Sequence, residues 1–173
     1  MKHQQPAANL RPVLVVEDSD EDFNTVVEAA ARARVGNRLV HAVDADSAQR
    51  LLAGDAVGDT AGETAGNTAG GFAFMLLDQN LPGTDGLSFL KQLRLDPLLS
   101  RLPTVILTTS GNPRDRDAFY DAGANAYHVK AVHYLDCLRT LEEIFGYWLN
   151  STTLPDMTPL GSAAAARQRE GKR

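Results

Sequence analysis

The sequence has little of what several specialised protein classes require. One cysteine, Cys137, among 173 residues allows neither an internal disulfide nor a thiolate metal cluster. No run approaches the roughly 18 apolar residues of a membrane span, and the first ten residues lack the apolar core of a signal peptide. With 43% hydrophobic, 23% charged and 6% aromatic residues, the composition is that of a soluble globular protein. We therefore expect a cytoplasmic protein without a membrane anchor.

Positive charge is scarce outside the C-terminal tail. The formal net charge is −5, and the residues from Gly161 onward carry +3, so the rest of the chain carries −8. An acidic body without a basic stripe and interleaved aromatics does not suit a nucleic-acid backbone. We therefore expect no direct nucleic-acid partner.

The order of apolar runs and helical patterns predicts one α/β domain. Five short apolar runs predict strands at 13–16, 38–43, 72–77, 104–107 and 126–129. Helical patterns follow them at about 20–34, 44–53, 86–96, 113–123 and 132–149. Such alternation predicts a parallel sheet with helices on both faces, whose functional site lies at the carboxyl ends of the strands.

Two segments fall outside this alternation. Residues 53–71 repeat the unit x-Thr-Ala-Gly with almost no bulky apolar side chain, which predicts a flexible surface insertion. Beyond the last helix we expect an arm at 150–160 and a disordered tail at 161–173. The 24 residues after Leu149 are too few for an output domain. We therefore expect the domain at 10–149 to act without one.

Polar side chains follow four of the predicted strands. Glu17 and Asp18 follow the first strand, Asp78 the third, Thr108 the fourth and Lys130 the fifth. Three carboxylates this close raise one another's pKa unless a cation lies between them. Hard oxygen ligands without histidine or thiolate select Mg²⁺ or a similar hard cation such as Mn²⁺.

This set of side chains suits phosphoryl transfer onto a carboxylate. Asp78 would be the nucleophile. The cation would be held by Glu17 or Asp18, by Asp78 and by a backbone carbonyl near Asn80. The lysine and the threonine at the strand ends would contact phosphoryl oxygens.

The sequence resembles the receiver domains of two-component response regulators. The resembling stretches are VLVVEDSDED at 13–22, LLDQNLPGTDG at 76–86, VILTTS at 105–110 and GANAYHVK at 123–130. Their order and spacing also match the family. The resemblance covers about residues 10–149. It implies a flavodoxin-like five-stranded parallel sheet of order 2-1-3-4-5, extended by a long C-terminal helix and arm.

The resemblance also implies roles for single residues. Matched in this way are the phosphoacceptor Asp78, the metal ligands Glu17, Asp18, Asp78 and Asn80 (through its backbone carbonyl), and the switch and phosphate-contacting residues Thr108, Tyr127 and Lys130. Family members take phosphate from a histidine kinase and lose it by autohydrolysis, without turning over an external substrate. The C-terminal end is most similar to small single-domain regulators paired with phytochrome-type kinases, in some cases with a downstream phosphotransfer protein.

Without an output domain, the phosphorylated state must be recognised through a changed surface. Several bulky side chains of the last helix and the arm do not belong to the apolar helix face that packs on the sheet. Exposed side chains of this kind suggest a contact with another protein. The predicted homodimer interface consists of Tyr134, Tyr147, Trp148, Leu154 and Pro155, with the arm reaching across a neighbouring copy.

The sequence departs from the family pattern at two places. Residue 131 is Ala, where the family usually has a proline in a cis bond. The peptide bond after Lys130 can therefore be trans. The repeat insertion lies away from the phosphorylation edge in the expected fold, and we expect it to leave the chemistry alone.

The sequence is also compatible with two other functions. A constitutive docking module would keep the fold without using phosphate. A phosphatase of the haloacid dehalogenase type also places an aspartate at a strand end. Such enzymes need a second carboxylate two residues later, and the sequence has Asn80 there.

Overall fold

The computed structural model describes residues 10–54 and 71–157. Nearly all of the predicted insertion at 53–71, the end of the arm at 158–160 and the predicted tail at 161–173 lie outside the described residues. Within the described part, no helix is long and apolar enough to cross a membrane.

The described residues form a five-stranded parallel sheet of order β2-β1-β3-β4-β5, which confirms the predicted order. Its strands are β1 (Val13–Val16), β2 (Leu39–Ala42), β3 (Met75–Leu77), β4 (Thr104–Thr108) and β5 (Ala126–Val129). Leu14 of β1 pairs with Val40 on one side and with Met75 on the other. The third strand is shorter than the predicted 72–77.

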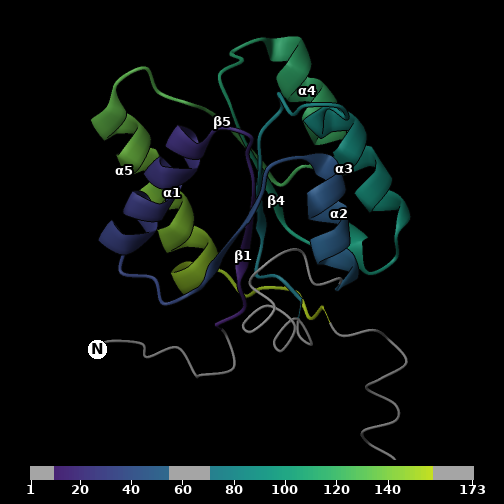
Figure 1. Ribbon diagram of the computed structural model, residues 1–173, viewed down its shortest axis with the longest axis horizontal. Coiled ribbons are helices and arrows are strands. Elements are labelled where there is room, and N and C mark those ends of the chain that lie inside the picture. The colour runs from purple at the N-terminus through teal and green to yellow at the C-terminus, as the bar shows by residue number, and fades with distance from the viewer. Residues whose placement is uncertain (1–9, 55–70, 158–173) are drawn as a thin grey trace, which may run out of the picture.

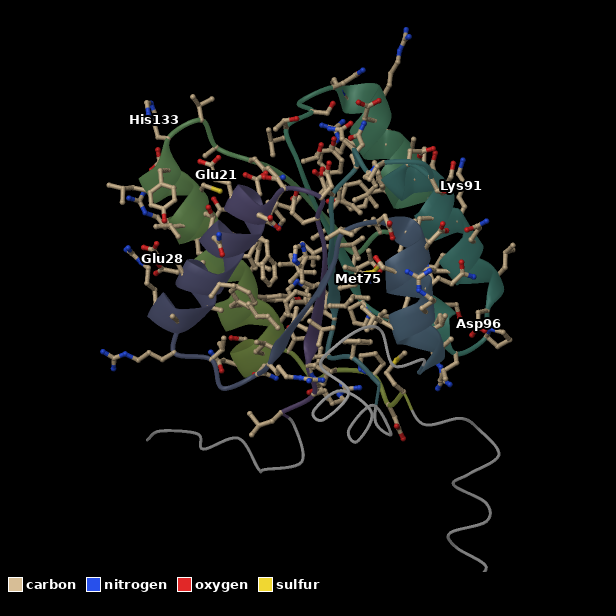
Figure 2. The ribbon with its side chains drawn as sticks, in the orientation of Figure 1. Glu21, Glu28, Met75, Lys91, Asp96 and His133 are labelled. Carbon is tan, nitrogen blue, oxygen red and sulfur yellow. The ribbon has the colours of Figure 1, made fainter. Side chains whose placement is uncertain are left out.

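Helices cover both faces of the sheet (Figure 1). They are α1 (Asp20–Arg32), α2 (Ala45–Ala53), α3 (Gly86–Leu95), α4 (Pro113–Asp121) and α5 (Tyr134–Phe145), with short turns η2 (Leu99–Arg101) and η3 (Gly146–Ser151). Helices α1 and α5 pack on one face, and α2, α3 and α4 on the other. Figure 2 shows Met75 between these two layers, at the centre of the molecule.

The two faces of the sheet explain why the strands read as unbroken apolar runs. Alternate residues of β1 enter different cores: Leu14 and Val16 lie in one cluster, and Val13 and Val15 in the other. All four are at most 2% exposed. A strand buried on both faces needs an apolar residue at each position.

Polar residues set where the helices begin and end. Ser19 accepts a bond from the Asp22 amide at the start of α1, and Asp44 forms a capping box with Ser47 at the start of α2. Gly54 ends α2 in the left-handed conformation. Helix α1 ends at Arg32, two residues before the predicted end at about 34, and Arg34 adopts a positive φ of 55°.

The C-terminal segment packs against its own chain. The predicted long last helix is α5 continued by the π-helical turn η3, and the ring of Trp148 stacks on Phe74 with centroids 6.0 Å apart. The carbonyl of Pro155 accepts a bond of 2.9 Å from Arg11. Met157 is 4% exposed in the core. The described part of the arm therefore packs on its own chain at the amino ends of the strands. The reach across a neighbouring copy stays a prediction.

Candidate functional site

Backbone hydrogen bonds fix the residues that follow the strands. The Glu17 amide donates to Ala42 O at 2.9 Å, and the Asp78 amide donates to Val16 O at 3.0 Å. The Lys130 amide donates to Thr108 O at 2.7 Å. Each bond continues the ladder one residue beyond its strand, so the side chains meet at the carboxyl edge as predicted.

Three carboxylates meet at this edge. One oxygen each of Glu17, Asp18 and Asp78 lies within 4.8 Å of the others. Glu17 and Asp78 are buried and Asp18 is exposed. His41 Nε2 lies 2.7 Å from the carbonyl oxygen of Glu17, and its ring stacks on Phe23, which holds the backbone of this loop. Three hard oxygen ligands open to solvent on one side fit a hard divalent cation.

Lys130 compensates part of this negative charge. Its Nζ lies 2.7 Å from Glu17 Oε2, 2.6 Å from Asp22 Oδ2 and 3.3 Å from Asp78 Oδ2. The side chain is 10% exposed. Burial lowers the pKa of Lys130, but its hydrogen bonds to Asp22 and Glu17 outweigh burial and raise the pKa overall. Burial raises the pKa of Glu17 despite its bond to Lys130.

Asp22 is a site residue that the sequence analysis missed. It lies in the first turn of α1 rather than directly after a strand, and its side chain is 44% exposed. The signal available was its place in the acidic run EDSDED, one helical turn after Asp18. Asp22 lies outside the cluster of Glu17, Asp18 and Asp78, and it contributes to the site by its ion pair with Lys130.

Thr108 and Tyr127 lie beside this cluster and share partners. Thr108 is fully buried, and its hydroxyl donates to Gln79 Oε1 at 3.3 Å. The Tyr127 hydroxyl donates to Ser110 O at 2.9 Å, and its ring lies 5.9 Å from that of Phe119 in α4. The two predicted switch residues are therefore linked through one loop, between β4 and α4.

The loop that carries Asp78 needs a glycine at its far end. The Gly86 amide donates to Gln79 O at 2.9 Å. A Cβ on Gly86 would collide with the backbone oxygen of Asp78. Gly86, predicted only as a helix start, thus permits α3 to begin against the loop of the predicted acceptor Asp78 (the acceptor loop). Every described peptide bond is trans, including Lys130–Ala131.

Known proteins share this arrangement. The family profile of the response regulator receiver domain matches residues 13–142. The chain belongs to this family. It is a receiver-domain response regulator, a protein of two-component signalling. Family membership decides against the haloacid dehalogenase alternative, and receiver domains do not turn over an external substrate.

Relatives cover most of the chain. Response regulator Rcp1 of Synechocystis sp. (strain ATCC 27184 / PCC 6803 / Kazusa) is 32% identical over 83% of this chain and 92% of its own length. The crystal structure of the phosphorylated cyanobacterial phytochrome response regulator RcpA superposes with a TM-score of 0.72 at 31% identity, covering 84% of this chain and 99% of RcpA.

The Mn²⁺-bound form of Rcp1 superposes equally well, with a TM-score of 0.72 at 32% identity, covering 84% of this chain and 99% of that structure. The cluster of Glu17, Asp18 and Asp78 fits the divalent-cation site of such a receiver domain.

Proposed function

We propose that this protein accepts a phosphoryl group on Asp78 from a histidine kinase of the phytochrome type. The observation that supports it most is that Lys130, Asp78, Glu17 and Asp18 lie together at one edge of the sheet. This arrangement provides a nucleophile, ligands for a cation and a contact for the phosphoryl group. The relatives described as phytochrome response regulators support the kinase class.

In the proposed reaction an Asp78 carboxylate oxygen forms a bond to phosphorus while the phosphorus–nitrogen bond of the kinase phosphohistidine breaks. The leaving imidazole keeps the electron pair and takes up a proton. A divalent cation, when bound, would neutralise negative charge on the transferring group. Glu17, Asp18, Asp78 and the backbone carbonyl of Asn80 would hold it. Hydrolysis later returns free phosphate and the carboxylate.

Lys130 already touches the acceptor carboxylate, 3.3 Å from Asp78 Oδ2. We infer that Nζ moves to a phosphoryl oxygen when Asp78 is phosphorylated, since the acyl phosphate adds negative charge within reach of the same ammonium group. The buried hydroxyl of Thr108 would donate to a second phosphoryl oxygen, and Tyr127 would follow it by repacking beneath α4.

The output is proposed to be a protein contact, including a homodimer through α5 and a downstream phosphotransfer protein. Tyr134 and Tyr147 are 51% and 57% exposed, and a cavity of about 580 Å³ lies beside Tyr147. Trp148 and Leu154 are half-buried against their own core, so they would contribute less than predicted. Pro155 lies at the amino edge of the sheet. Light scattering of Tyr147→Ser against wild type tests this interface.

The proposed acceptor is tested by intact mass after incubation with Mg²⁺ and acetyl phosphate. Wild type should gain one phosphoryl group, and Asp78→Asn should gain none. Asp46→Asn, which changes an exposed carboxylate in α2, is the matched control and should behave as wild type. No adduct on wild type, with a phytochrome-type kinase also tried as donor, would leave the constitutive docking module as the remaining function.

A further inference from the structure

Gln79, the residue after Asp78, joins three parts of the site through one side chain. Its Oε1 accepts from the Thr108 hydroxyl at 3.3 Å and lies 3.4 Å from the Tyr127 hydroxyl, whose proton goes to Ser110 O at 2.9 Å. Its Nε2 donates to Asp115 Oδ2 in the first turn of α4 at 3.2 Å. The amide therefore links the end of β4 to the first turn of α4 and lies beside Tyr127 of β5.

The Thr108 hydroxyl has one proton, and it donates this proton to Gln79 Oε1. The Ser110 amide donates to Thr108 Oγ1 at 3.1 Å, so that oxygen already acts as an acceptor. Donation to a phosphoryl oxygen would require the hydroxyl to leave Gln79 Oε1. Because Thr108 is fully buried, water does not replace a bond that is lost there.

We propose that Gln79 is a positioning residue that competes with the phosphoryl group for the Thr108 hydroxyl and so stabilises the resting arrangement of the β4–α4 loop. This inference rests on the proposed phosphorylation of Asp78. It assigns to the neighbour of the acceptor a direct influence on how readily the switch responds.

The Gln79 side chain also links Thr108 to α4, through its bond to Asp115. Asp115 Oδ2 accepts from Ser110 Oγ at 2.6 Å as well as from Gln79, so the loop and the helix share one carboxylate. A cavity of about 470 Å³ lies between the acceptor loop and α4, lined among others by Gln79, Asp115 and Phe119. Once Thr108 turns to the phosphoryl group, Gln79 has room to turn away, which loosens the first turn of α4.

The variant Gln79→Met tests the competition, because methionine has similar length and offers neither the acceptor nor the donor. The probe is beryllofluoride with Mg²⁺, a non-covalent phosphoryl mimic, titrated while the amide NMR signal of Ser110 is recorded. The variant should bind the mimic about twofold to tenfold more tightly than wild type, the range expected for one resting hydrogen bond. Gln49→Met, on an exposed position of α2, is the matched control and should bind as wild type.

A double-mutant cycle shows whether Gln79 acts through Thr108. In a Thr108→Val background, Gln79→Met should no longer change the affinity, whereas a purely structural effect would persist. Equal or weaker binding by Gln79→Met in the wild-type background would overturn the inference. Failure of wild type itself to bind the mimic or to take up phosphate would instead overturn the proposed function.

Discussion

The two edges of the sheet use their polar side chains differently. At the amino edge, donors bond to backbone oxygens: Arg11 donates to Pro155 O at 2.9 Å, and Asn37 donates to Arg11 O at 2.8 Å. Met157, two residues after Pro155, is buried. At the carboxyl edge, Lys130 bonds to three carboxylates. The bonds at the amino edge join the segment before β1 to the C-terminal arm and to the segment before β2. The carboxyl edge gathers three carboxylates whose negative charge Lys130 compensates in part and a bound cation would compensate further. Backbone contacts therefore stabilise the amino edge, whereas paired charges stabilise the carboxyl edge.

The largest effect is expected at the carboxyl edge from Lys130→Met. It leaves buried Glu17 and Asp78 without their ammonium partner, and breaking such a buried pair costs about 3 to 5 kcal/mol. Urea unfolding in a chelator should show this loss, and Mg²⁺ should restore much of it, because the cation would lie among the same carboxylates. Arg139→Met, at a 72% exposed ion pair, should cost less than about 1 kcal/mol. A variant as stable as wild type in the chelator would contradict this division of the two edges.

Met157→Ala probes the amino edge alone. Removing a buried methionine costs about 2 kcal/mol at the lower end of the usual range, which fits a side chain near the end of the described chain. Thermal unfolding should show the loss, while the rate of phosphorylation from acetyl phosphate should stay that of wild type. Leu95→Ala, at 84% exposure, should change stability by less than about 0.5 kcal/mol. A slower phosphorylation of Met157→Ala would show that the two edges are coupled.

Gly86→Ala should affect both stability and chemistry. The added Cβ meets the backbone oxygen of Asp78, so the acceptor loop must shift, at about 1 to 3 kcal/mol. Phosphorylation followed by intact mass should slow. Gly146→Ala adds a Cβ in open space at a helical φ of −58°, and it should stabilise by about 0.4 to 1 kcal/mol. If both variants behaved alike, the close approach of α3 to the acceptor loop would have no consequence.

The smallest effect is a pH slope caused by Glu17. Burial raises its folded pKa above the unfolded value, so the native state binds this proton more tightly. Its contribution to stability therefore falls as pH rises from the unfolded pKa through the raised folded pKa. In a chelator, the stability of Glu17→Gln relative to wild type should increase over that window, whatever constant offset follows from the lost bond to Lys130. A difference that does not depend on pH would show that burial leaves this carboxyl unperturbed.

The five strands and the meeting of Glu17, Asp18, Asp78, Thr108 and Lys130 at one edge could be predicted from the sequence, whereas the strand order was implied by the family resemblance. Buried parallel strands leave unbroken apolar runs, and the residue after each run must lie at the carboxyl edge. Local rules predict these features because each depends on neighbours in the chain.

Asp22 and Gln79 could not be assigned in the same way. Their roles depend on where Lys130 and Thr108 arrive from strands distant in sequence. The contacts of the arm with Arg11 and the core were not foreseen either, because they join residues that are far apart in the sequence. The end of α1 was placed too late because Arg34 adopts a conformation that usually favours glycine.

The most direct test of the account is to locate the phosphoryl group chemically. Protein phosphorylated with Mg²⁺ and acetyl phosphate would be reduced with borohydride, which converts an acyl phosphate to the alcohol and so turns the modified aspartate into homoserine. Peptide mass mapping should then find homoserine at position 78 in wild type and at no position in Asp78→Asn. Homoserine at another carboxylate, or none in phosphorylated wild type, would contradict the assignment of Asp78 as the acceptor.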